Sequence, residues 1–309
     1  MRRREGAAAR ESTFDEPIHC RLRRPAVRSR ACGLTPPRCS LAPGSWLVGR
    51  FALLRALGTK HGGRAWLADD AQTGERVVLK LATTPPACAA LAREAARLDG
   101  LAHPGIVKLT ALLEDARGAI LVTEYLPRGD LSGCRGKPWR DTLPLLQPAL
   151  DALAHLHAHG TVHGDLKSTN LVCSAEGRAR LVDLEDPQLD GVGRSSPYGR
   201  SPARWRGERA VAADDAYALG ALLYELIGGA PPLYPDLAAA RRGAQPPPVG
   251  AGRDVPVALC ALIVALLDPD PALRPGAPAV TRRLRKLFAT VPSAQGPAAR
   301  SAIHFPDAA

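Results

Sequence analysis

Aromatic residues are scarce in this chain. Only 4% of its 309 residues are Phe, Trp or Tyr, and there is a single Met. This argues against a core built on aromatic rings, so the 46% hydrophobic content must pack mainly through small and aliphatic side chains. The 29 Gly and 29 Pro interrupt regular structure at many points. The composition predicts a largely globular protein with an Ala- and Leu-packed interior and many turns.

Long apolar runs are also absent, and none approaches the roughly 20 residues needed to span a bilayer. The longest, residues 255–267, contains Pro256 and is predicted to be a buried helix. The N-terminal arginines are not followed by an apolar core, which argues against a targeting peptide. We therefore expect no membrane span.

Cysteine pairs with the spacing of a metal or redox motif are lacking as well. The seven cysteines are Cys20, Cys32, Cys39, Cys88, Cys134, Cys173 and Cys260. Their wide spacing and odd number predict a reducing compartment, with the cytoplasm as the expected location, and neither a zinc site nor a disulfide framework. Cys173 is predicted to be a small buried hydrophobe.

Acidic residues are too few to balance the basic ones, and the formal net charge is +11. Residues 1–45 contain ten Arg and four acids, so they contribute +6 of this charge. Because this segment has no apolar periodicity, it is predicted to be a disordered basic tail. An Arg-rich arm that binds nucleic acid is the less favoured interpretation, and nucleic acid is not the expected partner. Residues 291–309 are predicted to form a flexible C-terminal tail.

Apolar runs alternate with turn signals over residues 46–81, which predicts three antiparallel strands. The first turn holds Gly58, Gly62 and Gly63, whose missing Cβ atoms let backbone N–H groups approach a phosphate. A plain hairpin turn is the alternative. Lys80 lies in the middle of the third strand, where burial is costly unless an acid neutralises its charge.

Residues 87–98 offer such an acid. Leu91, Ala95 and Leu98 recur at helical spacing, and Glu94 lies beside this apolar face. A solvated glutamate is the alternative, but the buried Lys80 favours a pair. Two more strands in the segment 103–126 complete a predicted five-stranded sheet with one helix.

Residues 163–185 carry the densest set of chemical groups. Short apolar runs at 171–173 and 179–182 flank the turn sequence SAEG, which predicts a β-hairpin. The hairpin would place Asn170 beside Asp183, and the preceding loop would bring Asp165 and Lys167 to the same point. One base, one cation and two oxygen ligands are a set suited to phosphoryl transfer with Mg²⁺. A capped surface hairpin is the alternative.

Helical patterns dominate the rest of the chain, over residues 143–158, 214–229, 257–267 and 278–287. A loop rich in Gly, Ser and Pro is predicted at 186–202. The three histidines His155, His157 and His159 are predicted to cover a helix face rather than to bind a metal, because no Cys or carboxylate completes a tetrahedral set.

Eight motifs follow one another along the chain: LGTKHGGRAWLA, VVLK, LVTEYL, HGDLKSTN, DLE, SPARWRG, DDAYALG and DPDPALRP. In this order, over about residues 46–287, they resemble the motifs of the eukaryotic-like Ser/Thr protein kinase family. The composition favours a bacterial source. The resemblance implies an α+β bilobal fold, with a five-stranded antiparallel sheet and one helix in an N-lobe at 46–126 and a mainly helical C-lobe at 127–290. It also implies a protein substrate and a nucleotide as partners. No feature of the sequence indicates an oligomeric state.

The resemblance assigns roles to individual residues. Those that would bind ATP are Gly58, Gly63, Ala65, Lys80, Thr123, Glu124 and Leu126, with Thr123 as gatekeeper and the backbone of Glu124 and Leu126 meeting adenine. Asp165 would orient the substrate hydroxyl and accept its proton, Lys167 would steady the γ-phosphate, and Lys80 would pair with Glu94. Asn170 and Asp183 would bind Mg²⁺, with Mn²⁺ as an alternative. Ser196 would help select the hydroxyl residue, Asp215 would brace the catalytic loop, and Arg274 belongs to the closing motif.

Four positions depart from the family pattern. Gly164 replaces an arginine before the catalytic Asp, and Glu185 replaces the glycine two residues after the metal ligand. Lys60 replaces a glycine of the phosphate loop. Ala203 replaces the glutamate that normally pairs with the arginine equivalent to Arg274, so the C-lobe is expected to be less rigid or held differently.

These departures leave two competing functions. The first is a pseudokinase, a kinase-shaped binding or scaffolding protein with little phosphoryl transfer. The second is a small-molecule phosphotransferase of the aminoglycoside-kinase type, which the HGDL and DLE sequences resemble.

Overall fold

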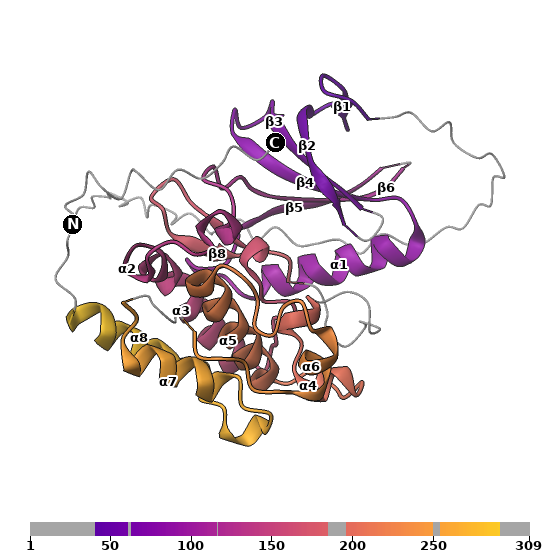
Figure 1. The fold of residues 1–309 in the computed structure, drawn as a ribbon. Helices are drawn as coiled ribbons and strands as arrows, with labels where there is room; N and C mark the ends of the chain where they lie inside the picture. Colours follow the sequence, from indigo (N-terminus) through magenta and orange to yellow (C-terminus); the bar gives the residue numbers. More distant parts are fainter. Residues whose placement is uncertain (1–40, 61–62, 116, 185–195, 250–253, 291–309) are drawn as a thin grey trace, which may run out of the picture. The chain divides into compact units, whose positions relative to one another are not determined.

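The computed structural model describes residues 41–60, 63–115, 117–184, 196–249 and 254–290, with the backbone alone at 58–60, 63–64 and 290 (Figure 1). The two predicted tails lie outside the described residues, apart from residues 41–45, and so does Glu185.

A six-stranded antiparallel sheet forms the N-lobe, with the order β1-β2-β3-β4-β6-β5. Its strands are β1 (Trp46–Leu47), β2 (Phe51–Lys60), β3 (Gly63–Asp70), β4 (Arg76–Ala82), β5 (Leu109–Asp115) and β6 (Gly118–Glu124). The predicted five strands are all present, and the sixth is the two-residue β1. Periodicity cannot reveal so short a strand, which turns back onto β2 through Val48 and Gly49, both at positive φ.

The two faces of the sheet have different neighbours because side chains alternate along each strand. Val77, Leu79 and Leu81 of β4 join a separate apolar cluster with residues of β1, β2, β3 and β6. Lys80 therefore points to the opposite face, where helix α1 (Pro85–Asp99) packs against β4 and β6 (Figure 1).

Helix α1 starts with two prolines, which are tolerated in the first turn because their missing N–H groups would have no helical partner there. Its buried residues are Leu91, Glu94, Ala95 and Leu98, so Glu94 lies on the apolar face. The predicted amphipathic helix is confirmed, three residues longer than the pattern indicated.

Helices dominate the C-lobe (Figure 1). They are α2 (Trp139–Thr142), α3 (Gln147–Ala158), α4 (Pro202–Trp205), α5 (Ala212–Gly228), α6 (Leu237–Arg242), α7 (Val257–Leu266) and α8 (Ala277–Thr290). The helix predicted over 143–158 is divided, because a 3-10 segment (Leu143–Leu146) precedes α3 and prolines occupy the early positions of both. Helices α4 and α6 were not predicted, since four to six residues carry no measurable period.

Helix α5 lies at the centre of the large apolar core and is buried along most of its length. It approaches α7 closely at Gly220, where an added Cβ would lie 2.7 Å from the Cβ of Leu266. A glycine is therefore required at this crossing by space alone. Within the described residues, no helix has the length and apolar character to cross a membrane.

The predicted hairpin is confirmed. Strands β7 (Leu171–Cys173) and β8 (Ala179–Leu181) are antiparallel, with Leu171 opposite Leu181 and Cys173 opposite Ala179. Cys173 is fully buried, as predicted, and burial raises the pKa of its thiol to about 12. The four described cysteines are free.

Candidate active site

Lys80 lies between two carboxylates from different parts of the chain. Its Nζ is 2.5 Å from Oε1 of Glu94 on α1 and also forms an ion pair with Asp183, which follows β8. Burial lowers the pKa of Lys80, but the charges of Asp183 and Glu94 raise it more, so the net pKa is above its ordinary value. The acid that the sequence required for Lys80 is therefore present, and a second one joins it.

Asp183 has a φ of 60°, in the left-handed region that residues with a Cβ seldom adopt. Such a backbone persists only where surrounding contacts enforce it, and it is common at functional sites. Here the hairpin holds the segment on one side, because Val182 donates its N–H to the carbonyl of Asn170 at 3.1 Å. The ion pair with Lys80 holds the Asp183 carboxylate on the other.

The loop before the hairpin gathers polar groups around Asp165. Lys167 Nζ lies 2.5 Å from Oδ2 of Asp165, and Asn170 Nδ2 donates to the same oxygen at 3.1 Å and to the backbone carbonyl of Asp165 at 2.9 Å. The backbone N–H of Ser196 donates to Oδ1 at 3.2 Å. The structure thus brings Asp165, Lys167, Asn170 and Ser196 together, with the Ser196 contact made by its backbone.

Asp215 on α5 braces the backbone of this loop. Its two carboxylate oxygens accept the backbone N–H groups of His163 and Gly164, each at 2.8 Å. His157 of α3 also contacts the carboxylate, with Nε2 at 2.8 Å from Oδ2. Burial raises the pKa of Asp215, but these hydrogen bonds and the nearby histidines lower it more, so the carboxyl stays ionised. His157 therefore does more than cover a helix face.

The predicted nucleotide-binding residues lie on adjacent strands. Gly58 of β2 is opposite Ala65 of β3, and Ala65 is opposite Lys80 of β4. Gly63 pairs with Lys60 at the end of the β2–β3 hairpin, and the side chain of Lys60 is outside what the structure describes. The strand register alone therefore brings the glycine turn and the lysine side by side.

The predicted hinge residues lie at the end of β6 and directly after it. Thr123 is buried and lies opposite Val78 of β4, and Leu126 is also buried. The Glu124 side chain accepts from the backbone N–H of Lys108 at 2.7 Å and forms an ion pair with Arg180 at 2.5 Å. The side chain of Glu124 is thus engaged by the protein, which fits a hinge that meets a ligand through its backbone.

Arg97 of α1 joins the helix to the segments that precede Asp165 and follow Asp183, a contact that the sequence did not reveal. Its Nη2 donates to the carbonyl of Val162 at 2.5 Å, and its Nη1 donates to the carbonyl of Leu184 at 3.1 Å. Arg97 is three residues after Glu94, so both lie on one helix face. That spacing was the only available signal.

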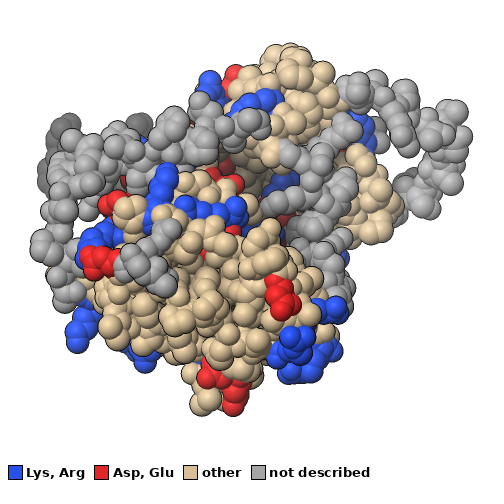
Figure 2. Space-filling view, viewed as in Figure 1, with Lys and Arg blue, Asp and Glu red and all other residues tan. Residues whose placement is uncertain are grey.

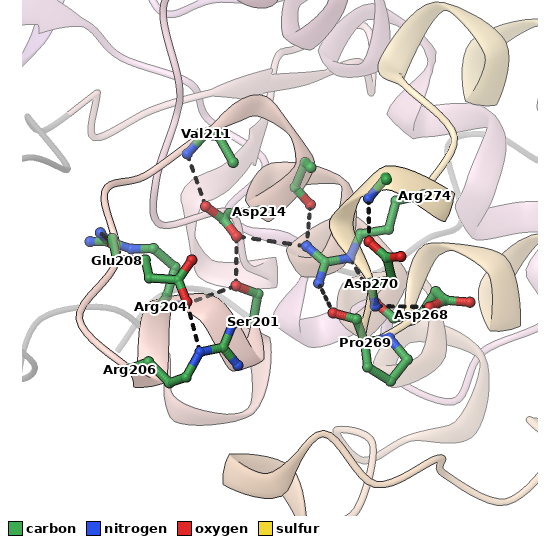
Figure 3. Close-up of polar contacts among 12 residues, drawn as sticks. Ser201, Arg204, Arg206, Glu208, Val211, Asp214, Asp268, Pro269, Asp270 and Arg274 are labelled. Atoms are coloured by element: carbon green, nitrogen blue, oxygen red, sulfur yellow. Dashed lines mark hydrogen bonds and ion pairs between the residues drawn. The ribbon is translucent and has the colours of Figure 1, made fainter.

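Figure 3 shows how the end of the loop after the hairpin is anchored. The Asp214 carboxylate accepts from Ser201 Oγ at 2.6 Å and from the backbone N–H of Val211 at 2.9 Å, and it lies 3.6 Å from Arg274 Nη1. Arg274 also donates to the backbone carbonyls of Ala213, Asp268 and Pro269 at 2.8–3.0 Å. Ala203 led us to expect a C-lobe that is either less rigid or held differently, and these contacts of Arg274 and Asp214 support the second outcome.

Asp183 and Asn170 could hold a divalent cation together with phosphate. Within the described residues, no group of three or more His, Cys, Asp or Glu forms a metal cage. Mg²⁺ does not need one, because it usually takes one or two protein ligands and fills its shell with phosphate and water oxygens. The two carboxylates on Lys80 carry one more negative charge than the lysine neutralises. These residues therefore fit a magnesium nucleotide.

Comparison with known proteins identifies the family. Residues 51–284 match the family model of the protein kinase domain. The chain is 31% identical to serine/threonine-protein kinase pkn2 of Myxococcus xanthus over an alignment of 265 residues, which covers 76% of this chain and 32% of that protein. It is 28% identical to serine/threonine-protein kinase PknA of Mycobacterium tuberculosis over an alignment of 255 residues, which covers 75% of this chain and 59% of that protein.

A third relative is the DNA damage-responsive serine/threonine-protein kinase RqkA of Deinococcus radiodurans, which is 31% identical over an alignment of 216 residues that covers 63% of this chain and 32% of that protein. The chain thus spans from about a third to three fifths of the length of these relatives. On the match to the kinase domain and on these similarities, the chain belongs to the protein kinase family, in its eukaryotic-like serine/threonine branch.

Proposed function

We propose that this chain transfers the γ-phosphoryl group of ATP to Ser and Thr hydroxyls of protein substrates, with Mg²⁺ as cofactor and Mn²⁺ as an alternative. The observation that carries the proposal is the position of Asp183 at the meeting of two clusters. It pairs with Lys80 from the sheet, and the hairpin that carries it begins at the Asn170–Asp165 cluster. Phosphoryl transfer depends on this kind of positioning and charge neutralisation.

In this proposal, Asp165 orients the substrate hydroxyl and accepts its proton, and Lys167 donates to the transferred phosphoryl group. Lys80, fixed by Glu94, binds the α- and β-phosphates. Asn170 and Asp183 would hold the Mg²⁺, which when bound neutralises phosphate charge.

Adenine would lie between the glycine turn and the hinge, against Gly58, Gly63 and Ala65 on one side. Thr123 and the backbone of Glu124 and Leu126 would meet its other edge. Ser196 would meet the substrate close to Asp165, which the hydrogen bond from its backbone N–H supports.

The cytoplasm, the cellular compartment that holds ATP, is the proposed location, and cell fractionation would test it. The lobes are proposed as 46–126 and 127–290.

The geometry argues against a pseudokinase. Two ion pairs that the proposed reaction would use are already formed, the Lys80–Glu94 pair and the Asp165–Lys167 pair. The family match argues against a small-molecule phosphotransferase, because it runs to residue 284 and so includes the C-lobe helices.

The test uses the purified chain with labelled ATP, Mg²⁺ and a generic basic protein, followed by phosphoamino-acid analysis. Label on Ser and Thr is expected, and Asp165→Asn should lower the rate by about 100-fold or more, since general-base catalysis contributes about that factor. Asp99→Asn, at an exposed site on α1, is the matched control.

Three results would contradict the proposal. Label transfer that is equal in Asp165→Asn would exclude Asp165 as the base. Thermal stabilisation by ATP without any transfer would favour the pseudokinase. Transfer to an aminoglycoside and to no protein would favour the small-molecule enzyme.

A further inference from the structure

An arginine-rich surface lies beside the proposed catalytic loop. It is formed by α4 with the turn after it and by α6, which pack against each other. We define this basic surface by its five arginines, Arg204, Arg206, Arg209, Arg241 and Arg242. Figure 2 shows a concentration of basic side chains over the part of the molecule where Figure 1 labels α4 and α6.

Trp205 ties the two halves of the surface together. The guanidinium of Arg241 lies 4.8 Å from the centre of its ring, and that of the buried Arg200 lies 4.6 Å from it. Both distances are within the range of cation–π attraction. The arginines of α4 and α6 therefore belong to one packed unit, in which the contacts to the Trp205 ring help to fix their relative positions.

Acidic residues do not neutralise this surface. Two acids lie within it, Glu208 and Asp236, which leaves a net charge of +3. Glu208 pairs with Arg206 at 2.7 Å, and Asp236 accepts the N–H of Ala239 at the start of α6. Arg209 and Arg242 are exposed, and neither has an ion pair with any described residue. The surface therefore presents positive charge to solvent.

The basic surface is continuous with the catalytic loop. A small cavity is lined by residues of the loop and of the surface, and its charged and hydroxyl-bearing lining includes Asp165, Ser196, Arg200, Arg204, Asp214 and Asp215. A polypeptide whose hydroxyl lies at Asp165 would thus lie next to Arg204, the member of the basic surface that lines this cavity.

We propose that the basic surface docks an acidic segment of the protein substrate, a run of Asp or Glu residues close to the phosphorylated Ser or Thr. The proposal rests on the proposed function for the identity of the partner. Continuity with Asp165 favours a polypeptide substrate over nucleic acid, because the hydroxyl and the acidic run then belong to one chain. Opposite charges on the basic surface and on the acidic segment would also raise the association rate, and added salt would reduce this effect.

Binding is measured first, without catalysis, on the full chain. The probe is a short fluorescent peptide with a central Ser flanked by Glu, compared with the same peptide carrying Gln, and anisotropy gives the Kd. We expect the Glu peptide to bind about tenfold more tightly than the Gln peptide, with the difference shrinking as salt is added. Arg209→Ala combined with Arg242→Ala should weaken Glu-peptide binding by about tenfold.

Arg282→Ala combined with Arg283→Ala is the matched control, because both are exposed arginines on α8. It should change the Kd by less than about twofold. In steady-state phosphorylation, the Arg209 and Arg242 variant should raise KM for the Glu peptide with kcat unchanged. Neither arginine contacts the catalytic groups, so basal transfer to a generic protein should persist.

Equal binding of the Glu and Gln peptides, or equal losses in the two double variants, would overturn the proposal. So would single-stranded DNA that binds more tightly than the Glu peptide and depends on the same arginines, which would make this a nucleic-acid surface. Peptide binding as expected but no transfer of label to any protein would overturn the proposed function alone.

Discussion

The carboxylate of Asp214 lies 3.6 Å from the guanidinium of Arg274, and both groups are buried. The same carboxylate accepts the Ser201 hydroxyl and caps the start of α5 through Val211. One side chain thus connects the end of the loop after the hairpin, helix α5 and the segment before α8. Burial lowers the pKa of Arg274 while the charge of Asp214 raises it, and the net pKa is lowered. Arg274 therefore depends on its hydrogen bonds to carbonyls as well as on Asp214.

Asp214→Asn should lower the free energy of unfolding by about 3 kcal/mol, because it leaves Arg274 buried without its counter-charge. Chemical denaturation would measure the loss. Asp254→Asn is the control, since Asp254 is exposed and its ion pair with Arg140 should contribute at most about 1 kcal/mol.

Ala203→Glu tests whether Asp214 compensates for the missing acid. Added to Asp214→Asn, it should recover part of the lost stability, because it returns a carboxylate to the position where the family has one. If the double variant is no more stable than Asp214→Asn, Asp214 does not compensate for the missing acid, and it acts only as a cap and a partner of Ser201.

Lys80→Met should reduce phosphoryl transfer by about 100-fold or more, because Glu94 and Asp183 would then face each other without a cation. Lys108→Met, at an exposed position, should leave the rate unchanged. Circular dichroism would show whether each variant remains folded. Transfer that survives Lys80→Met at the wild-type rate would remove Lys80 from the proposed site.

The net raised pKa of Lys80 also sets an expectation for pH dependence. Its contribution to stability is fully present below the unfolded value of about 10.5 and is lost only as the pH rises above it. The rate profile between pH 6 and about 9 should therefore contain no step from Lys80. A step in this range that Lys80→Arg abolishes would contradict this assignment.

The local parts of the candidate site could be predicted from the sequence. The hairpin follows from two short apolar runs and a turn, and its register alone places Asn170 near Asp183. The partner of Lys80 could be predicted because a buried lysine needs an acid, and Glu94 was beside the nearest apolar helix face. Each inference used residues close together in the chain or a strong energetic requirement.

The missed contacts join distant segments through polar groups with no period. Arg97 reaches carbonyls 65 and 87 residues away, which depends on how the sheet and the helices dock. His157 looked like one of three histidines on a helix surface, and only the fold shows that it meets Asp215. Asp214 looked like the start of a helix, and its second role at Arg274 is visible only in space.

Arg97→Ala should lower kcat by about tenfold while the KM for ATP changes by less than about threefold. The reason is that Arg97 holds α1 against the carbonyls on both sides of the proposed catalytic residues, and a lost charge-assisted hydrogen bond costs about 1.5–3 kcal/mol. Arg97→Lys should recover little, since one ammonium cannot reproduce the two-pronged contact. Arg93→Ala, exposed on the same helix, is the control. Equal kinetics for Arg93→Ala and Arg97→Ala would exclude the positioning role.

His163 should make the fold sensitive to mild acid. It is buried, its Nδ1 accepts the N–H of Asp165 at 3.3 Å, and its Nε2 has no partner among the described residues. Burial lowers its pKa, and the charge of Arg97 adds to this, although Asp215, Asp165 and Asp183 act in the opposite direction. The imidazole ring of His163 is therefore neutral in the folded protein. A proton on Nδ1 would also remove the acceptor for the N–H of Asp165.

A lowered folded pKa means that the unfolded chain binds the proton first as the pH falls. The stability from His163 is present above the unfolded value of about 6.5 and is lost below it, by up to about 1.4 kcal/mol per pH unit. Chemical denaturation of the wild type between pH 7.5 and about 5 should show this slope. His163→Asn keeps an acceptor and removes the titrating group, so its slope should be shallower by up to one proton. Because the other histidines are the same in both proteins, parallel slopes would assign the acid sensitivity to them and not to His163.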